Sequence, residues 1–204
     1  MIVTIDPGHG GNDPGAAGID PRSYEQVIEA ELNWSLADWI EVFLGDEGHS
    51  ATLTRQGPED GPSFATRVSA AAGSHCMVSI HHNASESAGA RGFEIFVHRP
   101  EGGEVRERDM ALAALILEEC RVVLEAWGIP LRNPPIKADA DWASRGRLTV
   151  LARCGPPACL IEVCFLTNPL ELLAALQDSF QAQVAKAIAG GITRFGAEVL
   201  NETG

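Results

Sequence analysis

Two histidines and two glutamates in this chain have the side-chain types and the positions that a catalytic metal site requires. His9 lies in a glycine- and proline-rich turn directly after the strand-like run 2–6, and His81 ends a later strand. Glu162 lies near the end of the last predicted strand, and Glu29 near the start of the first helix. A catalytic zinc ion takes three protein ligands and a water molecule, and a further carboxylate accepts the proton of that water. This set is large enough to fill both roles.

The choice between His81 and His82 follows from the alternation of side chains along a strand. Neighbouring strand residues point to opposite faces of a sheet. Ser79, His81 and Asn83 therefore share one face, while Ile80 and His82 share the other. Because Ile80 belongs to the packed face, His81 is the better ligand. His82 stays an alternative if the strand ends there.

Most of these side chains also have a simpler structural explanation. His9 alone would be an ordinary turn residue. Glu29, at a helix N-terminus, would interact favourably with the helix dipole without binding a metal, and Glu25 and Glu31 are rival carboxylates nearby. Glu162 is harder to explain structurally, because it lies within an apolar stretch and an unpaired buried charge is costly. A function or a firm partner is therefore expected for Glu162.

The elements that must position these residues alternate between strands and helices. This alternation predicts the α/β fold class, with a mostly parallel sheet covered by helices on both faces. In such a sheet, functional groups gather at the carboxyl ends of the strands. We expect one domain over residues 1–204, with no second module. The predicted strands are 2–6, 51–54, 76–81, 92–97 and 158–163; the predicted helices are about 26–45, 62–73, about 104–127 and, broken near Asp178, about 169–199; residues 7–24 and 128–147 are predicted loops, and 148–151 a short strand or helical turn.

Composition narrows the class of protein further. The 204 residues carry a net charge of −13, which argues against nucleic acid as a partner and against docking to an anionic membrane. No apolar run is long enough to span a membrane, and no secretory signal is visible, so we expect synthesis in the cytoplasm. The five cysteines form no CxxC pair and mostly lie in apolar surroundings, which predicts buried, reduced thiols: Cys76, Cys120, Cys154, Cys159 and Cys164.

Several motifs in this order resemble one known family. The chain is similar to the zinc-dependent N-acetylmuramoyl-L-alanine amidases of the AmiA/AmiC and CwlV type, called Amidase_3, over about residues 1–190. The matching segments are Asp6-Pro-Gly-His-Gly-Gly11 with Asp13-Pro-Gly-Ala16, Glu29-Ala-Glu-Leu-Asn33, Leu53-Thr-Arg55 with Arg67, Ser79-Ile-His-His-Asn-Ala84, and Leu160-Ile-Glu-Val-Cys-Phe-Leu-Thr-Asn168. The resemblance implies a phosphorylase/hydrolase-like α/β fold.

The resemblance also implies an activity and assigns roles to the residues. It implies zinc bound by His9, Glu29 and His81, with Glu162 as the catalytic carboxylate, and cleavage of the amide between muramic acid and L-alanine in peptidoglycan. Asp6 and Asn83 are candidates to support the ligands or to contact the substrate. Arg55 and Arg67 are expected to form structural ion pairs rather than to contact the substrate.

The resemblance leaves the biological role open. Val163 is bulkier than usual for the family, so the pocket there is expected to differ. The chain shows no extra helical insert between Glu29 and His81, which predicts an open site, and we find no wall-binding segment. A single catalytic domain without a visible export signal favours a phage- or prophage-type lysin that acts on the cell wall after release or export. The alternatives are a bacterial cell-wall remodelling amidase, a zinc peptidase that acts on stem peptides, and a wall-binding module without catalysis.

Overall fold

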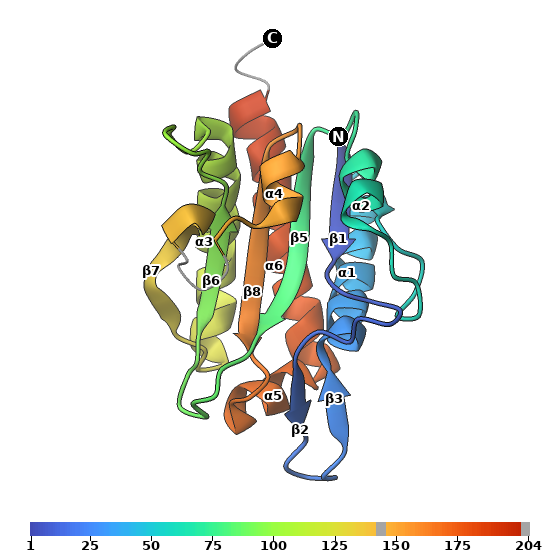
Figure 1. The fold of residues 1–204 in the computed structure, drawn as a ribbon, viewed down its shortest axis with the longest axis vertical. Helices are drawn as coiled ribbons and strands as arrows, with labels where there is room; N and C mark the ends of the chain where they lie inside the picture. Colours follow the sequence, from blue (N-terminus) through green and yellow to red (C-terminus); the bar gives the residue numbers. More distant parts are fainter. Residues whose placement is uncertain (142–145, 201–204) are drawn as a thin grey trace.

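A six-stranded sheet forms the centre of this computed structural model, which describes residues 1–141 and 146–200 (Figure 1). Four neighbouring strands run parallel to one another, while β6 is antiparallel to β8 and β7 is parallel to β6. The predicted α/β class with a mostly parallel sheet is therefore confirmed. In spatial order the strands are β4 (Ser50–Leu53), β1 (Ile2–Pro7), β5 (Cys76–Asn83), β8 (Ala158–Phe165), β6 (Phe93–Val97) and β7 (Leu131–Ala138).

One face of the sheet is covered by the three long helices α1 (Glu29–Asp46), α3 (Glu107–Ala126) and α6 (Asp178–Phe195). Helix α6 contacts both α1 and α3. Residues spaced four apart form the buried stripe of a helix, because 3.6 residues complete one turn. In α1 this stripe is Leu32, Leu36, Ile40 and Leu44. The main hydrophobic core lies between these helices and the sheet.

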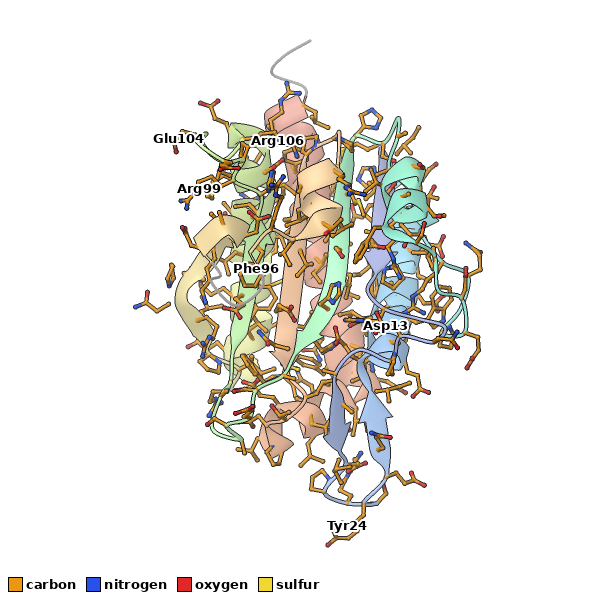
Figure 2. All side chains as sticks on the ribbon, in the orientation of Figure 1. Asp13, Tyr24, Phe96, Arg99, Glu104 and Arg106 are labelled. Carbon is orange, nitrogen blue, oxygen red and sulfur yellow. The ribbon has the colours of Figure 1, made fainter. Side chains whose placement is uncertain are left out.

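In the described part of the chain, the helices on the opposite face of the sheet are short. Helices α2 (Phe64–Ala70) and α4 (Thr149–Arg153) contact each other, and a small apolar cluster lies beneath them, with Met77, Phe96 and Leu160 from the sheet. Figure 2 shows Phe96 on this face. Strand β8 is buried along its whole length, as expected for a central strand covered on both sides. The prediction of helices on both faces is confirmed.

The predicted loop 7–24 contains regular structure. Strand β2 (Ala17–Ile19) pairs antiparallel with β3 (Gln26–Ile28), so α1 begins at residue 29 rather than near 26. A three-residue strand is too short to show an alternating pattern. Gly18 obscures it further, although the structure needs a glycine there: a Cβ atom at this position would lie 2.3 Å from the Leu166 carbonyl oxygen.

The predicted loop 128–147 is also partly wrong. Residues 131–138 form the edge strand β7, followed by a short 3-10 helix (Asp139–Asp141), while the part of the prediction on residues 142–145 lies outside the described residues. Pro134 and Pro135 gave the segment its loop-like composition. A proline removes a backbone donor, which an edge strand tolerates, and the pairing with β6 shifts register between Phe93 and Ile95.

The remaining elements agree with the predictions to within a few residues. The segment after β8 forms two helices, α5 (Pro169–Ala175) and α6, with the break near Asp178 as expected, and 148–151 belongs mainly to the short helix α4. Asn168 caps α5 by accepting hydrogen bonds from two backbone N–H groups. All five cysteines are buried and free, as predicted. In the part of the chain that the structure describes, no helix has the length and hydrophobicity needed to cross a bilayer.

Candidate metal centre

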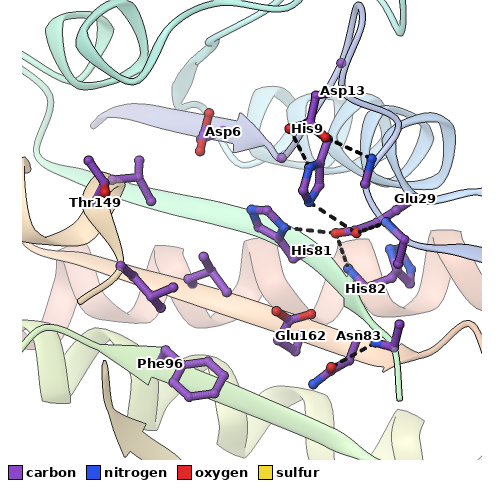
Figure 3. A pocket seen from close by; sticks show the side chains of 18 of the residues that line it. Asp6, His9, Asp13, Glu29, His81, His82, Asn83, Phe96, Thr149 and Glu162 are labelled. Carbon is purple, nitrogen blue, oxygen red and sulfur yellow. Dashed lines mark hydrogen bonds and ion pairs between the residues drawn. The ribbon is translucent and has the colours of Figure 1, made fainter. Parts of the chain in front are cut away.

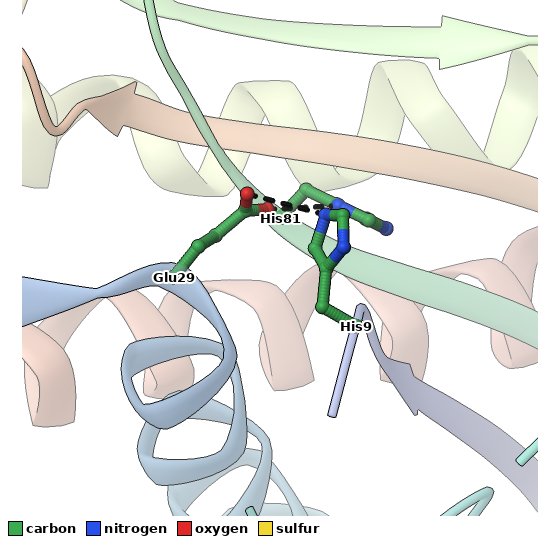
Figure 4. Close-up of side chains that lie close together, drawn as sticks. All are labelled: His9, Glu29 and His81. Carbon is green, nitrogen blue, oxygen red and sulfur yellow. Dashed lines mark hydrogen bonds and ion pairs between the residues drawn. The ribbon is translucent and has the colours of Figure 1, made fainter. Parts of the chain in front are cut away.

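The structure brings His9, Glu29 and His81 together, although they lie far apart in the sequence. One nitrogen or oxygen atom of each lies within 4.8 Å of the others. The Glu29 carboxylate approaches both rings from one side (Figure 4): it is 3.2 Å from His9 Nε2 and 2.9 Å from His81 Nδ1. His9 and His81 keep 21% and 18% of their side-chain surface exposed, so the cluster faces solvent on one side.

His9 is held by a turn that two buried arginines fix in place. Its φ of +60° is uncommon for a residue with a side chain and needs support from its surroundings. Arg67 donates hydrogen bonds to the carbonyl oxygens of Pro7 and His9, and Arg55 donates to those of Pro7 and Gly8. These bonds fix the backbone on both sides of the turn, which aims the His9 ring at Glu29.

The two arginines differ in the partner that they use. Arg67 forms the expected ion pair, with Asp6 at 2.8 Å. Arg55 instead donates to carbonyl oxygens, including that of Ala30 in α1. Burial and the charge of Arg67 lower the pKa of Arg55 to about 10, so it still carries its charge at neutral pH. Both arginines hold the backbone around His9; the predicted ion pair is present for Arg67, whereas Arg55 binds carbonyl oxygens.

Glu29 is the first residue of α1, and the hairpin β2–β3 brings it to the sheet. Its two oxygens accept hydrogen bonds from the backbone N–H groups of Ala16 and His82 and from the side-chain amide of Asn33. The helix N-terminus adds a further favourable field for the carboxylate. The rivals Glu25 and Glu31 are exposed and lie outside the cluster.

The electrostatics of the cluster favour a negative Glu29 beside two imidazoles. Burial acts to raise the pKa of Glu29, but the hydrogen bonds and charges of His81 and His9 lower it far below its usual range. Burial likewise opposes protonation of His9, yet Glu29 and, less strongly, Asp13 raise the pKa of His9 above its usual value. Asp13 accepts from His9 Nδ1 at 2.9 Å, which orients the ring with Nε2 toward Glu29.

This donor set suits a zinc ion. Zinc is bound in proteins by imidazole nitrogen and carboxylate oxygen, and catalytic sites use three protein ligands with one position left for water or substrate. Here two imidazoles and one carboxylate converge, one imidazole is oriented by a second carboxylate, and solvent reaches the cluster. The residues therefore fit the ion that the sequence predicts.

Glycines keep the backbone close to these ligands. A Cβ atom on Gly8 would lie 2.2 Å from His81 Cε1, and one on Gly15 would lie 2.6 Å from Glu29 Oε2. Only residues without a Cβ atom allow this approach. The glycine-rich turn thus sets the space in which the rings sit.

We expect Gly8→Ala to weaken zinc binding by about tenfold or more while the protein stays folded. The new methyl group must push the His81 ring away from Glu29, and small displacements of a ligand are costly to metal affinity. Competition with a zinc-sensitive dye measures the affinity. Gly45→Ala in α1 is the control, because nothing lies within 4 Å of a Cβ atom there. Equal affinity in both variants would contradict the role given to Gly8.

Glu162 lies on β8, directly beside His81 in the pairing of β5 with β8. Register partners on neighbouring strands point to the same face, so Glu162 shares the face of the cluster. Figure 3 shows its carboxylate directed into the cleft close to His81. Only 7% of Glu162 is exposed, as expected from its apolar surroundings in the sequence.

These residues line one cleft of about 1180 Å³ on the face that carries the short helices. Phe64, at the start of α2, is 56% exposed on one side of the cleft. Glu94 on β6 and Arg132 and Lys137 on β7 line it as well. The sequence does not single out these residues, because the prolines of β7 predict a loop and Glu94 belongs to no motif. The pairing of β6 with β7 brings these side chains together, and no local sequence pattern indicates that pairing.

The other candidates hold their neighbours in place. Asp6 is buried and accepts hydrogen bonds from Thr54 and Ser79 in addition to its ion pair. Asn83 donates to Glu94 at 2.8 Å and is not one of the three clustered side chains. His82 is buried, where its Nδ1 bonds Asn33 at 2.8 Å, and burial lowers its pKa to about 4. His82 is therefore neutral and outside the cluster.

Comparison of this chain with known proteins shows which family it is similar to. Residues 3–194 match the family model Amidase_3, described as N-acetylmuramoyl-L-alanine amidase. The germination-specific N-acetylmuramoyl-L-alanine amidase of Bacillus subtilis (strain 168) is 27% identical, covering 97% of this chain and 80% of the relative. The endolysin of Bacillus phage SPP1 is 30% identical, covering 98% of this chain and 66% of the endolysin. The catalytic domain of CwlV, an N-acetylmuramoyl-L-alanine amidase from Bacillus (Paenibacillus) polymyxa var. colistinus, superposes with a TM-score of 0.79 at 29% identity, covering 96% of this chain and 97% of that domain.

Proposed function

The chain belongs to the Amidase_3 family of N-acetylmuramoyl-L-alanine amidases, and we propose that it cleaves the amide between N-acetylmuramic acid and L-alanine in peptidoglycan with a zinc ion held by His9, Glu29 and His81. The observation that carries the zinc assignment is the convergence of these three side chains on one point of an open cleft. When bound, zinc supplies a Lewis acid that polarises the amide carbonyl and makes water nucleophilic near neutral pH.

In this proposal Glu162 moves the proton. Its carboxylate accepts a proton from the attacking water and passes it to the amide nitrogen, so that the C–N bond breaks and L-alanine leaves as an amine. Its place beside His81 on the neighbouring strand supports this role, because a base must be within hydrogen-bond reach of the water. Its burial limits the access of competing solvent to the carboxylate.

The remaining residues hold this arrangement still. Asp13 orients the ring of His9, and Asn33 with two backbone N–H groups orients Glu29. Preorganised ligands need no rearrangement during the reaction, which is where much of an enzyme's rate enhancement arises. The exposed ring of Phe64 at the cleft offers an apolar surface to a sugar ring.

Digestion of purified peptidoglycan tests the function. We expect new L-alanine amino termini, identified by mass analysis of the soluble products and by N-terminal labelling, with glycan chains left intact. The activity should disappear with a chelator and return with added zinc. New reducing sugar ends would indicate a glycosidase instead. Cleavage within the stem peptide would favour the peptidase alternative and refute the proposed bond.

A further inference from the structure

Two cations on β7 enter the cleft beyond the catalytic residues. Arg132 and Lys137 line the cleft, and both pair with the single carboxylate of Glu94, Arg132 at 3.7 Å and Lys137 at closer range. Glu94 is nearly buried, whereas 40% of the Arg132 side chain and 24% of the Lys137 side chain are exposed. Arg132, Lys137 and Glu94 together carry a net charge of +1, and the two cations are the exposed members of the group.

Arg132 is also held in position by an aromatic ring. Its guanidinium lies 5.4 Å from the centre of the Phe165 ring, within the range of a cation–π contact. Glu94 is itself fixed by the amide of Asn83 at 2.8 Å. The group is therefore preorganised rather than a pair of mobile surface side chains. In a chain with a net charge of −13, a fixed positive patch inside a cleft favours an anionic ligand at that point.

The strand order sets the direction from the metal ligands to this patch. His81, Glu162 and Glu94 are register partners across β5, β8 and β6, so they form a row across the sheet. The cations of β7 reach the end of that row through their ion pairs with Glu94. Because Glu162 gives its proton to the leaving amine, the peptide side of the scissile bond lies on the Glu162 side of the row. The peptide therefore continues toward Arg132 and Lys137.

The spacing indicates which part of the peptide reaches the cations. Neighbouring strands lie about 4.8 Å apart, so a charge held beside Glu94 lies about 5–10 Å from Glu162. An extended peptide advances about 3.3–3.6 Å per residue, so this span corresponds to the second residue after the scissile bond. The chemical group that suits two cations at that point is a carboxylate.

On the basis of the proposed function, we propose that Arg132 and Lys137 form a subsite for the free α-carboxylate of the second stem-peptide residue, and that they make the enzyme prefer peptides in which this group is not amidated. The preference acts in substrate binding, because the subsite lies beyond the reacting atoms. It is expected to change KM more than kcat.

Two synthetic disaccharide tripeptides test the subsite, one with D-glutamate and one with D-isoglutamine as the second residue. The wild-type protein should cleave the D-glutamate compound with a KM about tenfold lower and a similar kcat. Lys137→Met and Arg132→Gln should each reduce this ratio toward one, whereas Lys137→Arg should keep it. Lys186→Met is the matched control, since it removes an equal charge from an exposed position on α6. Thermal unfolding checks that each variant is folded.

The outcomes separate the subsite from the proposed function. Cleavage of both compounds by the wild-type protein with equal KM would overturn the subsite and leave the amidase function intact. A preference that survives in the folded Lys137→Met and Arg132→Gln variants would also overturn it. Failure of the wild-type protein to cleave either compound would overturn both the function and the subsite. Because the first comparison uses the wild-type protein alone, it decides the question even if a variant fails to fold.

Discussion

Replacing Glu162 by glutamine is expected to lower kcat by about 10²–10⁴-fold while zinc stays bound. Glutamine has nearly the same shape as glutamate, so the packing of β8 is preserved. It accepts no proton from water at neutral pH and has none to give to the leaving amine. Because Glu162 is not among the three clustered side chains, the metal site should be unaffected.

The rate of peptidoglycan turnover tests the expected loss of kcat, and the zinc content tests whether the metal stays bound. Turnover is followed by the release of L-alanine amino termini, and zinc by elemental analysis of the purified protein. Glu125→Gln, an exposed position on α3, makes the same chemical change away from the cleft and should leave both values unchanged. A Glu162→Gln protein with near wild-type turnover would remove Glu162 from the mechanism.

Replacing Glu29 or His81 by alanine is expected to abolish both stoichiometric zinc binding and activity. The wild-type protein should carry about one zinc ion per chain. Loss of a residue that merely orients a metal ligand costs about 10–100-fold in affinity, so loss of a ligand should cost more. Removing Glu29 also leaves His9 and His81 without the carboxylate that both rings contact.

The matched control for Glu29→Ala is Glu31→Ala. Glu31 lies two residues further along the same helix, is exposed, and was the rival candidate in the sequence. It should retain zinc and activity. Zinc content and activity are measured as for Glu162→Gln, with circular dichroism to verify folding. A metal-free protein with full activity, or a Glu29→Ala protein that keeps its zinc, would refute the metal site.

The sequence predicts the parts of the site that depend on strand position. The apolar runs before His81 and around Glu162 predict that both residues lie near strand ends. In the structure β5 and β8 are neighbouring strands, and these two residues are register partners. The preference for His81 over His82 rests on strand alternation alone. In the structure His81 joins the cluster and His82 is buried against Asn33.

The sequence is less informative where a contact depends on how a long connection folds. The sequence pattern alone does not show which of Glu25, Glu29 and Glu31 is the ligand, because all three lie near the start of the same helix. The hairpin β2–β3 makes the choice, by placing Glu29 against Ala16 and the end of β5. The β7 residues were missed for a related reason, since proline composition hid an edge strand whose pairing is long-range.

Local periodicity and side-chain type are properties of the chain itself, so they predict the α/β class, the core strands and long helices, and the ligand residues, but not the strands β2, β3 and β7. Which of the reactive residues meet depends on the tertiary fold. Contacts between His9, Glu29 and His81, and between Glu94 and the cations of β7, join segments far apart in the chain. These contacts depend on strand order and register. Strand order and register are set when the whole apolar core becomes buried, so no local sequence pattern encodes them.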